Sequence, residues 1–320
     1  MDILSDVITV MRAGRPQSAR VTWHAPWGQR FAPVPGASGF QVVLQGNCWL
    51  LPAAAAPIPL GPGDVVFLPH GGGHALSDDP RTPLSTEACD PDDPQFAQRH
   101  AATVDPVRSD GPVTITLCGA YRLDPTRAHP LLLGLPEIIH LPAGPGQHPR
   151  LRAAVELLGA ELEQPDLGVD ATIPSLLDTL LVYILRTWIQ CQPGENPGGW
   201  AAALNDPSVT AALHAIHRDT AHPWTVAGLA AQAGLSRAPF ARRFTTLVGQ
   251  PPLTYLTWWR MTTAARLLRD TTAPLHDIAT KVGYSSEFAF AAAFKRAHGT
   301  PPGQYRRAEH SNGSNQRQFT

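Results

Sequence analysis

The sequence has little charge, few cysteines and no apolar run long enough to cross a bilayer. Only 16% of its 320 residues are charged, while 43% are hydrophobic. A transmembrane helix needs about 20 consecutive apolar residues, and no stretch approaches that length. The first residues, MDILSDVITVMRAGR, lack the basic segment, apolar stretch and small-residue cleavage site of an export signal. These absences predict a soluble cytoplasmic protein that contacts no membrane.

The four cysteines are scattered. None of Cys48, Cys89, Cys118 and Cys191 is part of a CxxC pair, the spacing typical of structural zinc sites. Permanent disulfides are rare in a reducing compartment. We therefore expect free thiols, no bound metal and no cofactor.

Charge divides the chain into two parts. Residues 1–200 carry 12 Lys and Arg against 20 Asp and Glu, whereas residues 201–310 carry 12 against 6. A single core rarely exceeds ~250–300 residues, so the length predicts two domains. The basic second part is the part expected to meet a polyanion.

The first part is rich in short apolar runs separated by Gly, Pro and Asp, a pattern typical of antiparallel strands. It is followed by two helical patterns, of which the second has a wide apolar stripe that can pack on its own sheet or form a subunit interface. The predicted strands are 40–44, 48–51, 64–69 and 113–123, with a loop over 77–110 and helices over 151–162 and 173–189.

These patterns predict an α+β, two-domain protein whose first domain is an antiparallel β-sandwich or β-barrel with following helices and whose second domain is all-α. The composition QPGENPGG at 192–199 is typical of a linker. Beyond it, Asp206 can cap a helix that begins at Pro207. The predicted parts are 1–150 (sensor), 151–192 (packing or dimerisation helices), 193–203 (linker), 204–308 (helical domain) and 309–320 (disordered tail).

The helical part contains an internal repeat at an offset of fifty residues. Phe240 pairs with Phe290 and Phe244 with Phe294, and each copy ends in G-x-P-P-x-x-Y. Upstream the offset is forty-nine, because the second copy has one extra residue in its turn. Two copies of one supersecondary unit are therefore present.

Each copy meets the physical requirements of a helix-turn-helix. A small residue lets two helices approach, a glycine four residues later takes the positive-φ corner, and a serine caps the second helix. Paired phenylalanines at i and i+4 bury one face of that second helix. The residues are Ala230, Gly234 and Ser236 in the first copy, and Ala279, Gly283 and Ser285 or Ser286 in the second.

Residues 204–308 resemble the AraC-type DNA-binding domain over its whole length. The resemblance rests on PWTVAGLAAQAGLSRAPFARRFTTLVGQPPLTYLTWWRMTTAARLL and IATKVGYSSEFAFAAAFKRAHGTPPGQYRR. It implies seven helices, with a long helix over about 252–268 joining the two units, and two recognition helices that enter successive major grooves of double-stranded DNA.

Carried onto this chain, the resemblance assigns the first recognition helix to base reading, with Arg242 as the chief reader of guanine. The second copy departs from the usual pattern at Ala291 and Ala292, so we expect it to contact mainly phosphates. The expected DNA-contacting residues are Ser236, Arg237, Ala238, Ala241, Arg242, Ser285, Ser286, Glu287, Lys295, Arg296 and Arg306.

The stretch GDVVFLPHGGGH at 63–74 resembles the second motif of cupin barrels. The metal-binding members need further ligands that the stretch 39–51 does not supply, so His74 is expected to be a turn or pocket histidine. The chain as a whole resembles an AraC subgroup that includes a reactive-chlorine-sensing activator. The candidate effector or redox residues are Cys48, His70, His74 and Cys118.

These observations predict a non-enzymatic, DNA-binding transcription regulator controlled by a small molecule or an oxidant, acting as a homodimer and contacting RNA polymerase. Two alternatives stay open at this point. One is a cupin-type metal-dependent enzyme with an accessory DNA-binding domain, and the other is an effector-free architectural DNA protein.

Overall fold

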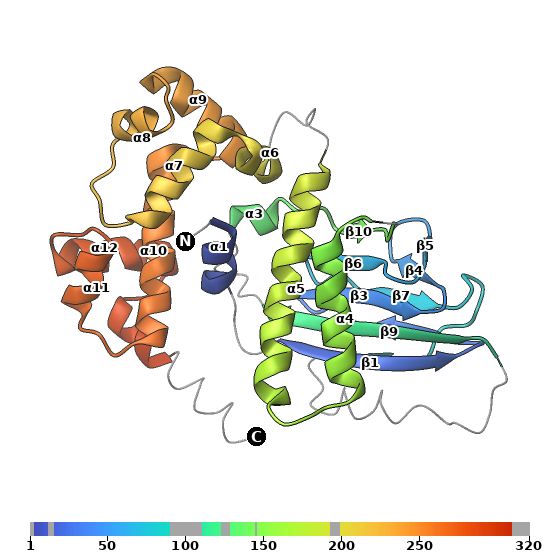
Figure 1. The fold of residues 1–320 in the computed structure, drawn as a ribbon. Coiled ribbons are helices and arrows are strands. Elements are labelled where there is room, and N and C mark those ends of the chain that lie inside the picture. The colour runs from blue at the N-terminus through green and yellow to red at the C-terminus, as the bar shows by residue number, and fades with distance from the viewer. Residues whose placement is uncertain are drawn as a thin grey trace. The chain divides into compact units, whose positions relative to one another are not determined.

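The computed structural model describes residues 3–11, 16–89, 111–122, 129–144, 146–192 and 199–308. They form two compact units, one of residues 11–192 and the other of residues 1–10 with 193–320 (Figure 1). The predicted tail over 309–320, most of the predicted linker and residues 90–110 of the predicted 77–110 loop lie outside the described residues. The domain boundaries proposed from the sequence stay predictions.

Two five-stranded sheets form the unit of residues 11–192. The first has the order β1 (Gln17–His24), β9 (Val113–Arg122), β3 (Ala37–Gln45), β6 (Val65–Leu68) and β10 (Ile139–Leu141). The second has the order β5 (Ile58–Leu60), β4 (Cys48–Pro52), β7 (His74–Ser77), β2 (Gly28–Phe31) and β8 (Ala88–Cys89). Neighbouring strands are antiparallel except β2 and β8, which pair in parallel.

The four predicted strands all exist, as β3, β4, β6 and β9, although β6 is one residue shorter at each end than the predicted 64–69. They were recognisable because each is a short, mainly apolar run, and their side chains supply much of the core. Phe40, Leu50, Phe67 and Leu117 are fully buried. The strands β2, β5, β7, β8 and β10 have two to four residues each, too few to show an alternating pattern.

Helices α3 (Pro130–Leu133), α4 (Pro149–Glu163) and α5 (Val169–Cys191) complete this unit, with α4 and α5 packed against each other. Of the helices in the described residues, only α5 is long and apolar enough to cross a membrane by length and composition alone. Its stripe is nevertheless used inside the unit, since Leu177, Leu180, Ile184 and Leu185 are buried. The hydroxyl of Tyr121 in β9 donates to the carbonyl of Leu177 at 2.7 Å. This helix is therefore a core helix that packs on its own sheet.

The second unit is helical, as predicted. Its helices are α6 (Trp200–Asn205), α7 (Pro207–Arg218), α8 (Val226–Gln232), α9 (Arg237–Val248), α10 (Pro252–Asp270), α11 (Leu275–Lys281) and α12 (Glu287–His298), followed by a helical segment over 302–308. The Asp206 side chain accepts a hydrogen bond from the backbone N of Val209, which confirms the predicted cap of α7. The long helix predicted between the two repeat copies is α10.

A helix from the other end of the chain groups with this helical unit. Asp6 lies in α1 (Ile3–Met11), and its Oδ2 is 3.1 Å from Nδ1 of His217. The other ring nitrogen of His217 is 2.7 Å from the hydroxyl oxygen of Tyr255 in α10. Burial lowers the pKa of His217, and the hydrogen bond with Asp6 opposes that shift. Nothing in the sequence near residue 6 had indicated this contact.

Candidate DNA interface and effector pocket

The first helix-turn-helix consists of α8 and α9. Ala230 on α8 is buried, as expected for a small residue where two helices approach, and Gly234 has φ of 66° at the corner between them. Phe240 and Phe244 of α9 are both fully buried. One face of α9 is thereby fixed in the core, and the opposite face is left to solvent.

The second helix-turn-helix, α11 and α12, repeats this construction. Ala279, Phe290 and Phe294 are buried, and Gly283 has φ of 82°. A Cβ at Gly283 would lie 2.6 Å from the carbonyl oxygen of Ala221, so a larger residue fits there neither by conformation nor by space. The repeat found in the sequence is therefore a repeat of structure.

The serine caps differ between the two copies. Ser286 is the N-cap of α12, and its hydroxyl accepts a hydrogen bond from the backbone N of Ala289 at 3.5 Å. Ser236 stands at the N-cap position of α9, but its side chain makes no capping hydrogen bond. Ser285 is exposed and precedes the cap. Among the three serines considered as caps, Ser286 alone makes the capping bond.

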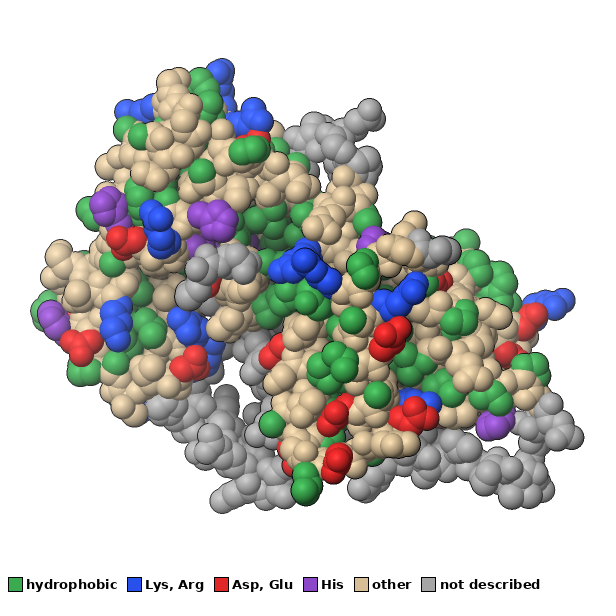
Figure 2. All heavy atoms as spheres, viewed as in Figure 1, with side chains coloured by type: hydrophobic (Ala, Val, Ile, Leu, Met, Phe, Trp, Pro, Cys, Tyr) green, Lys and Arg blue, Asp and Glu red, His purple; other side chains and the backbone are tan. Residues whose placement is uncertain are grey.

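The outward faces of the two recognition helices carry the predicted base-reading residues. On α9, Arg237, Ala238 and Arg242 are exposed and Ala241 is half-buried. Figure 2 shows blue Lys and Arg side chains gathered over α9. Arg242 has no hydrogen bond or ion pair with the described part of the chain, so its guanidinium is available for a ligand.

The corresponding face of α12 has a different chemistry. Glu287, Phe288, Ala289 and Ala292 are exposed, and Ala291 is half-buried. Phe288 is 89% exposed, and reasoning from the sequence had not selected it. Lys295 and Arg296 are exposed near the C-terminal end of the same helix.

Two other arginines of the basic part have internal partners. Both Nε and a terminal nitrogen of Arg243 bind the Oδ2 of Asp206, the Nε at 2.6 Å. Burial alone would raise the pKa of Asp206, but hydrogen bonds from Arg243 and the Val209 backbone lower it below its usual value. Arg306, predicted to contact phosphate, is half-buried and donates to the carbonyl of Ala273 at 2.6 Å. One terminal nitrogen of Arg306 is thereby engaged inside the helical unit, and we propose Lys295 and Arg296, which are exposed, as the main phosphate contacts.

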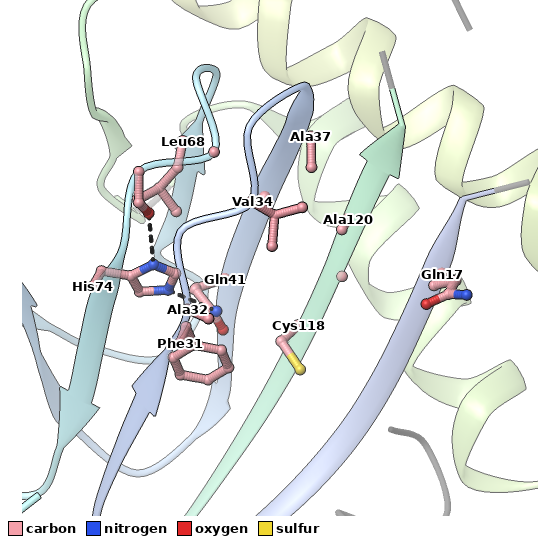
Figure 3. A pocket seen from close by; sticks show the side chains of 14 residues that line it. Gln17, Phe31, Ala32, Val34, Ala37, Gln41, Leu68, His74, Cys118 and Ala120 are labelled. Carbon is pink, nitrogen blue, oxygen red and sulfur yellow. Dashed lines mark hydrogen bonds between the residues drawn. The ribbon is translucent and has the colours of Figure 1, made fainter. Parts of the chain in front are cut away.

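The β unit has a pocket between its two sheets. Its cavity volume is about 50 Å³. Figure 3 shows Gln41 from β3 and His74 from β7 next to each other on one side of the pocket and Cys118 from β9 on another. The lining residues are Gln17, Phe31, Ala32, Val34, Ala37, Gly39, Gln41, Leu68, Gly71, Gly72, His74, Cys118, Gly119 and Ala120, none of which is an acid, a lysine or an arginine.

The polar part of the pocket is the pair of Gln41 and His74. Gln41 Nε2 is 3.0 Å from His74 Nε2, and His74 Nδ1 is 3.4 Å from the carbonyl of Gly72. Burial lowers the pKa of His74 to about 4, so the ring is neutral at pH 7. Nδ1 then carries the proton toward Gly72, and Nε2 accepts from the amide of Gln41.

This arrangement leaves one hydrogen bond of Gln41 open. Its Oε1 is buried and has no hydrogen-bond partner among the described residues. If the amide were rotated by 180°, its NH₂ group would lack a partner instead. In either orientation a buried polar atom is unpaired. This lowers the stability of the fold unless a ligand or a water molecule forms the missing hydrogen bond.

The other predicted effector or redox residues lie in different surroundings. His70 Nε2 is 2.9 Å from the backbone oxygen of Leu135, a contact inside the fold. Cys48 and Cys118 are buried, and burial raises the pKa of each thiol to about 12. A thiol with so high a pKa has almost no thiolate at pH 7, the form that reacts with oxidants. In the described residues no group of three His, Cys, Asp or Glu side chains converges as a metal site would require.

The fold and the two recognition helices define a DNA-binding transcription regulator with a cupin-type domain. The Cupin family model matches residues 2–190, and a Helix-turn-helix domain model matches residues 229–308. An AraC-like transcription regulator of Streptomyces lividans is 37% identical over 310 residues, which are 96% of this chain and 98% of the relative. The chain belongs to the AraC family of transcription regulators.

Two further relatives align with most of this chain. The HTH-type transcriptional regulator MtrA of Neisseria gonorrhoeae is 29% identical over 96% of this chain and 98% of its own length. The RCS-specific HTH-type transcriptional activator RclR of Escherichia coli is 31% identical over 85% of this chain and 87% of its own length. Among solved structures, the DNA-binding domain of AdpA in complex with a target DNA is 33% identical, with a TM-score of 0.32, and covers 33% of this chain and 96% of that one.

Proposed function

We propose that this cytoplasmic regulator is controlled by a small uncharged molecule that binds between the two sheets of its cupin unit. The open hydrogen bond of Gln41 in the pocket is the observation that carries the proposal. A ligand with one hydroxyl or amide group on an apolar body would satisfy it, and no charged side chain lines the pocket to balance an ionic ligand.

The ligand acts on DNA binding by linkage. It shifts the protein toward the arrangement that binds it more tightly, and it can change DNA affinity only by that difference in affinity. We propose that the protein acts as a homodimer, because two copies present their recognition helices together, and that the DNA-bound dimer contacts RNA polymerase. The recognition helices α9 and α12 are the proposed contact with double-stranded DNA.

A transcription reporter tests the effector proposal. Cells that carry the regulator and a selected binding site are exposed to a panel of small neutral alcohols, phenols and amides. We expect one class to change reporter output and Gln41→Leu to abolish that response while DNA affinity without effector is retained. Gln147→Leu is the matched control, because Gln147 lines a different surface pocket. A response that survives Gln41→Leu unchanged contradicts the proposal.

A redox signal at Cys118 is the second candidate, because this thiol lines the same pocket. It is disfavoured by the pKa of about 12. Treatment of the reporter strain with hypochlorous acid separates the two signals. A response lost in Cys118→Ser and kept in Gln41→Leu would establish the redox mechanism instead.

The cupin-enzyme alternative requires a bound metal. Elemental analysis of the purified full chain tests it directly. We expect less than one zinc, iron or manganese per chain. One metal per chain that is lost in His74→Ala would revive the enzyme hypothesis.

A further inference from the structure

The second recognition helix presents an aromatic ring to solvent. Phe288 is 89% exposed, whereas Phe290 and Phe294 of the same helix are fully buried. It lies in the first turn of α12, directly after Glu287. The buried phenylalanines complete the core of this unit, so the fold gives Phe288 no packing role.

Phe288 occupies a position in α12 from which a side chain can contact DNA bases. The repeat aligns Phe288 with Ala238 of the first copy, and Ala292 with Arg242. Residues 288 and 292 are separated by four positions and therefore share a face of the helix. In helix-turn-helix proteins the first turns of the recognition helix contact base edges in the major groove.

The exposed face of α12 is apolar and therefore suits an apolar group in the major groove of DNA. Phe288, Ala289 and Ala292 form an exposed apolar surface that can donate or accept no side-chain hydrogen bond. The C5-methyl group of thymine is the apolar feature of the major groove, and Ala and Phe side chains are suited to contact it. Guanine, adenine and cytosine carry no methyl group there.

We propose that Phe288, together with Ala292, reads thymine methyl groups in the half-site under α12. This helix then specifies sequence by apolar contact, and α9 specifies it by hydrogen bonds from Arg242. The prediction from the sequence, that the second unit contacts mainly phosphates, overlooked Phe288 because a lone phenylalanine beside a Phe pair looks like a further core residue. The proposal depends on DNA binding by this family and not on the effector.

The experiment removes the methyl group and nothing else. Site selection from random DNA with the full-length protein gives the preferred sequence, and each thymine under α12 is then replaced by deoxyuridine. Binding is followed by fluorescence anisotropy. At one or two positions we expect the loss of the methyl to weaken the wild type about fourfold, the effect of one buried methyl group. At the thymine that Phe288 contacts, Phe288→Ala should bind both DNAs equally, with the affinity of the wild type for the deoxyuridine site or lower, because the alanine side chain is too short to reach the methyl group. A thymine that Ala292 contacts should keep its sensitivity.

Two control variants make the result specific. Leu253→Ala removes another exposed apolar side chain of the same unit, at the start of α10, and should keep the full sensitivity to deoxyuridine. Phe288→Leu keeps an apolar side chain at this position and should retain part of the sensitivity to deoxyuridine. Because Phe288 is exposed, Phe288→Ala should melt at the wild-type temperature.

Three outcomes would overturn the proposal. Deoxyuridine could leave the wild-type affinity unchanged at every thymine under α12. The sensitivity to deoxyuridine could be the same in Phe288→Ala as in the wild type. Phe288→Ala could also keep both DNA affinity and sequence preference and lose only transcription from the reporter, which would make Phe288 a contact for a protein partner.

Discussion

Replacing Arg242 with alanine should weaken DNA binding without changing the stability of the fold. The side chain is exposed and has no partner in the described part of the chain, so its loss should change the free energy of unfolding by less than about 0.5 kcal/mol. If its guanidinium grips guanine O6 and N7 together, its removal costs about 1–3 kcal/mol of binding. The dissociation constant for the cognate site should then rise about 5- to 150-fold.

The assay is fluorescence anisotropy on the selected site and on single-base variants of it. In Arg242→Ala the preference for guanine at one position under α9 should disappear, while preferences under α12 remain. Arg242→Lys should recover only part of the affinity, because an ammonium cannot form the two parallel bonds of a guanidinium.

The neighbouring arginine provides the matched control. Arg243 is bound to the buried carboxylate of Asp206, which also caps α7. Arg243→Ala should therefore lower the melting temperature of the helical unit and leave base preference unchanged. If Arg242→Ala kept every base preference intact, or if Arg243→Ala were the variant that lost one, the assignment of these two side chains would be refuted.

Further predictions concern the phosphate contacts, the buried histidine and the pocket. Arg296→Ala should weaken binding to all sequences alike and reduce the slope of log affinity against log salt by about 1, as measured in a salt titration; a loss confined to one sequence would refute a phosphate role. Tyr255→Phe leaves His217 Nε2 without its partner and should cost about 1–3 kcal/mol in a urea unfolding experiment, and an unchanged midpoint would contradict it. Because the pKa of His74 is about 4 in the fold and ~6.5 in an unfolded chain, its contribution to stability is complete above pH 6.5 and is lost as the pH falls toward 4. His74→Gln should show a weaker loss of stability between pH 7.5 and pH 5 in urea unfolding, and identical losses in the two proteins would show that His74 is not the group responsible.

Most of the helical unit could be predicted from the sequence, because the features that define it are local. Phenylalanines spaced by four, a glycine at the corner and Asp206 before Pro207 each act within a few residues of the chain. The repeat then showed that two such units were present. The same locality revealed four mainly apolar strands of the β unit, whereas β1 (Gln17–His24), which has many polar residues, was not predicted.

Contacts between distant residues could be decided only by the tertiary structure. Gln41 and His74 meet because β3 and β7 lie in facing sheets, and nothing near residue 41 indicates an amide with an open hydrogen bond. The resemblance selected Arg242 as the base reader, but only the position of Asp206 at the N-cap of α7 shows that the adjacent Arg243 is held by an ion pair inside the helical unit. The sequence by itself thus determined the main helices, four of the strands and which helix faces are apolar, since these depend on periodicity. The tertiary structure decided which polar groups are satisfied, because a hydrogen bond depends on where the chain brings its partners together.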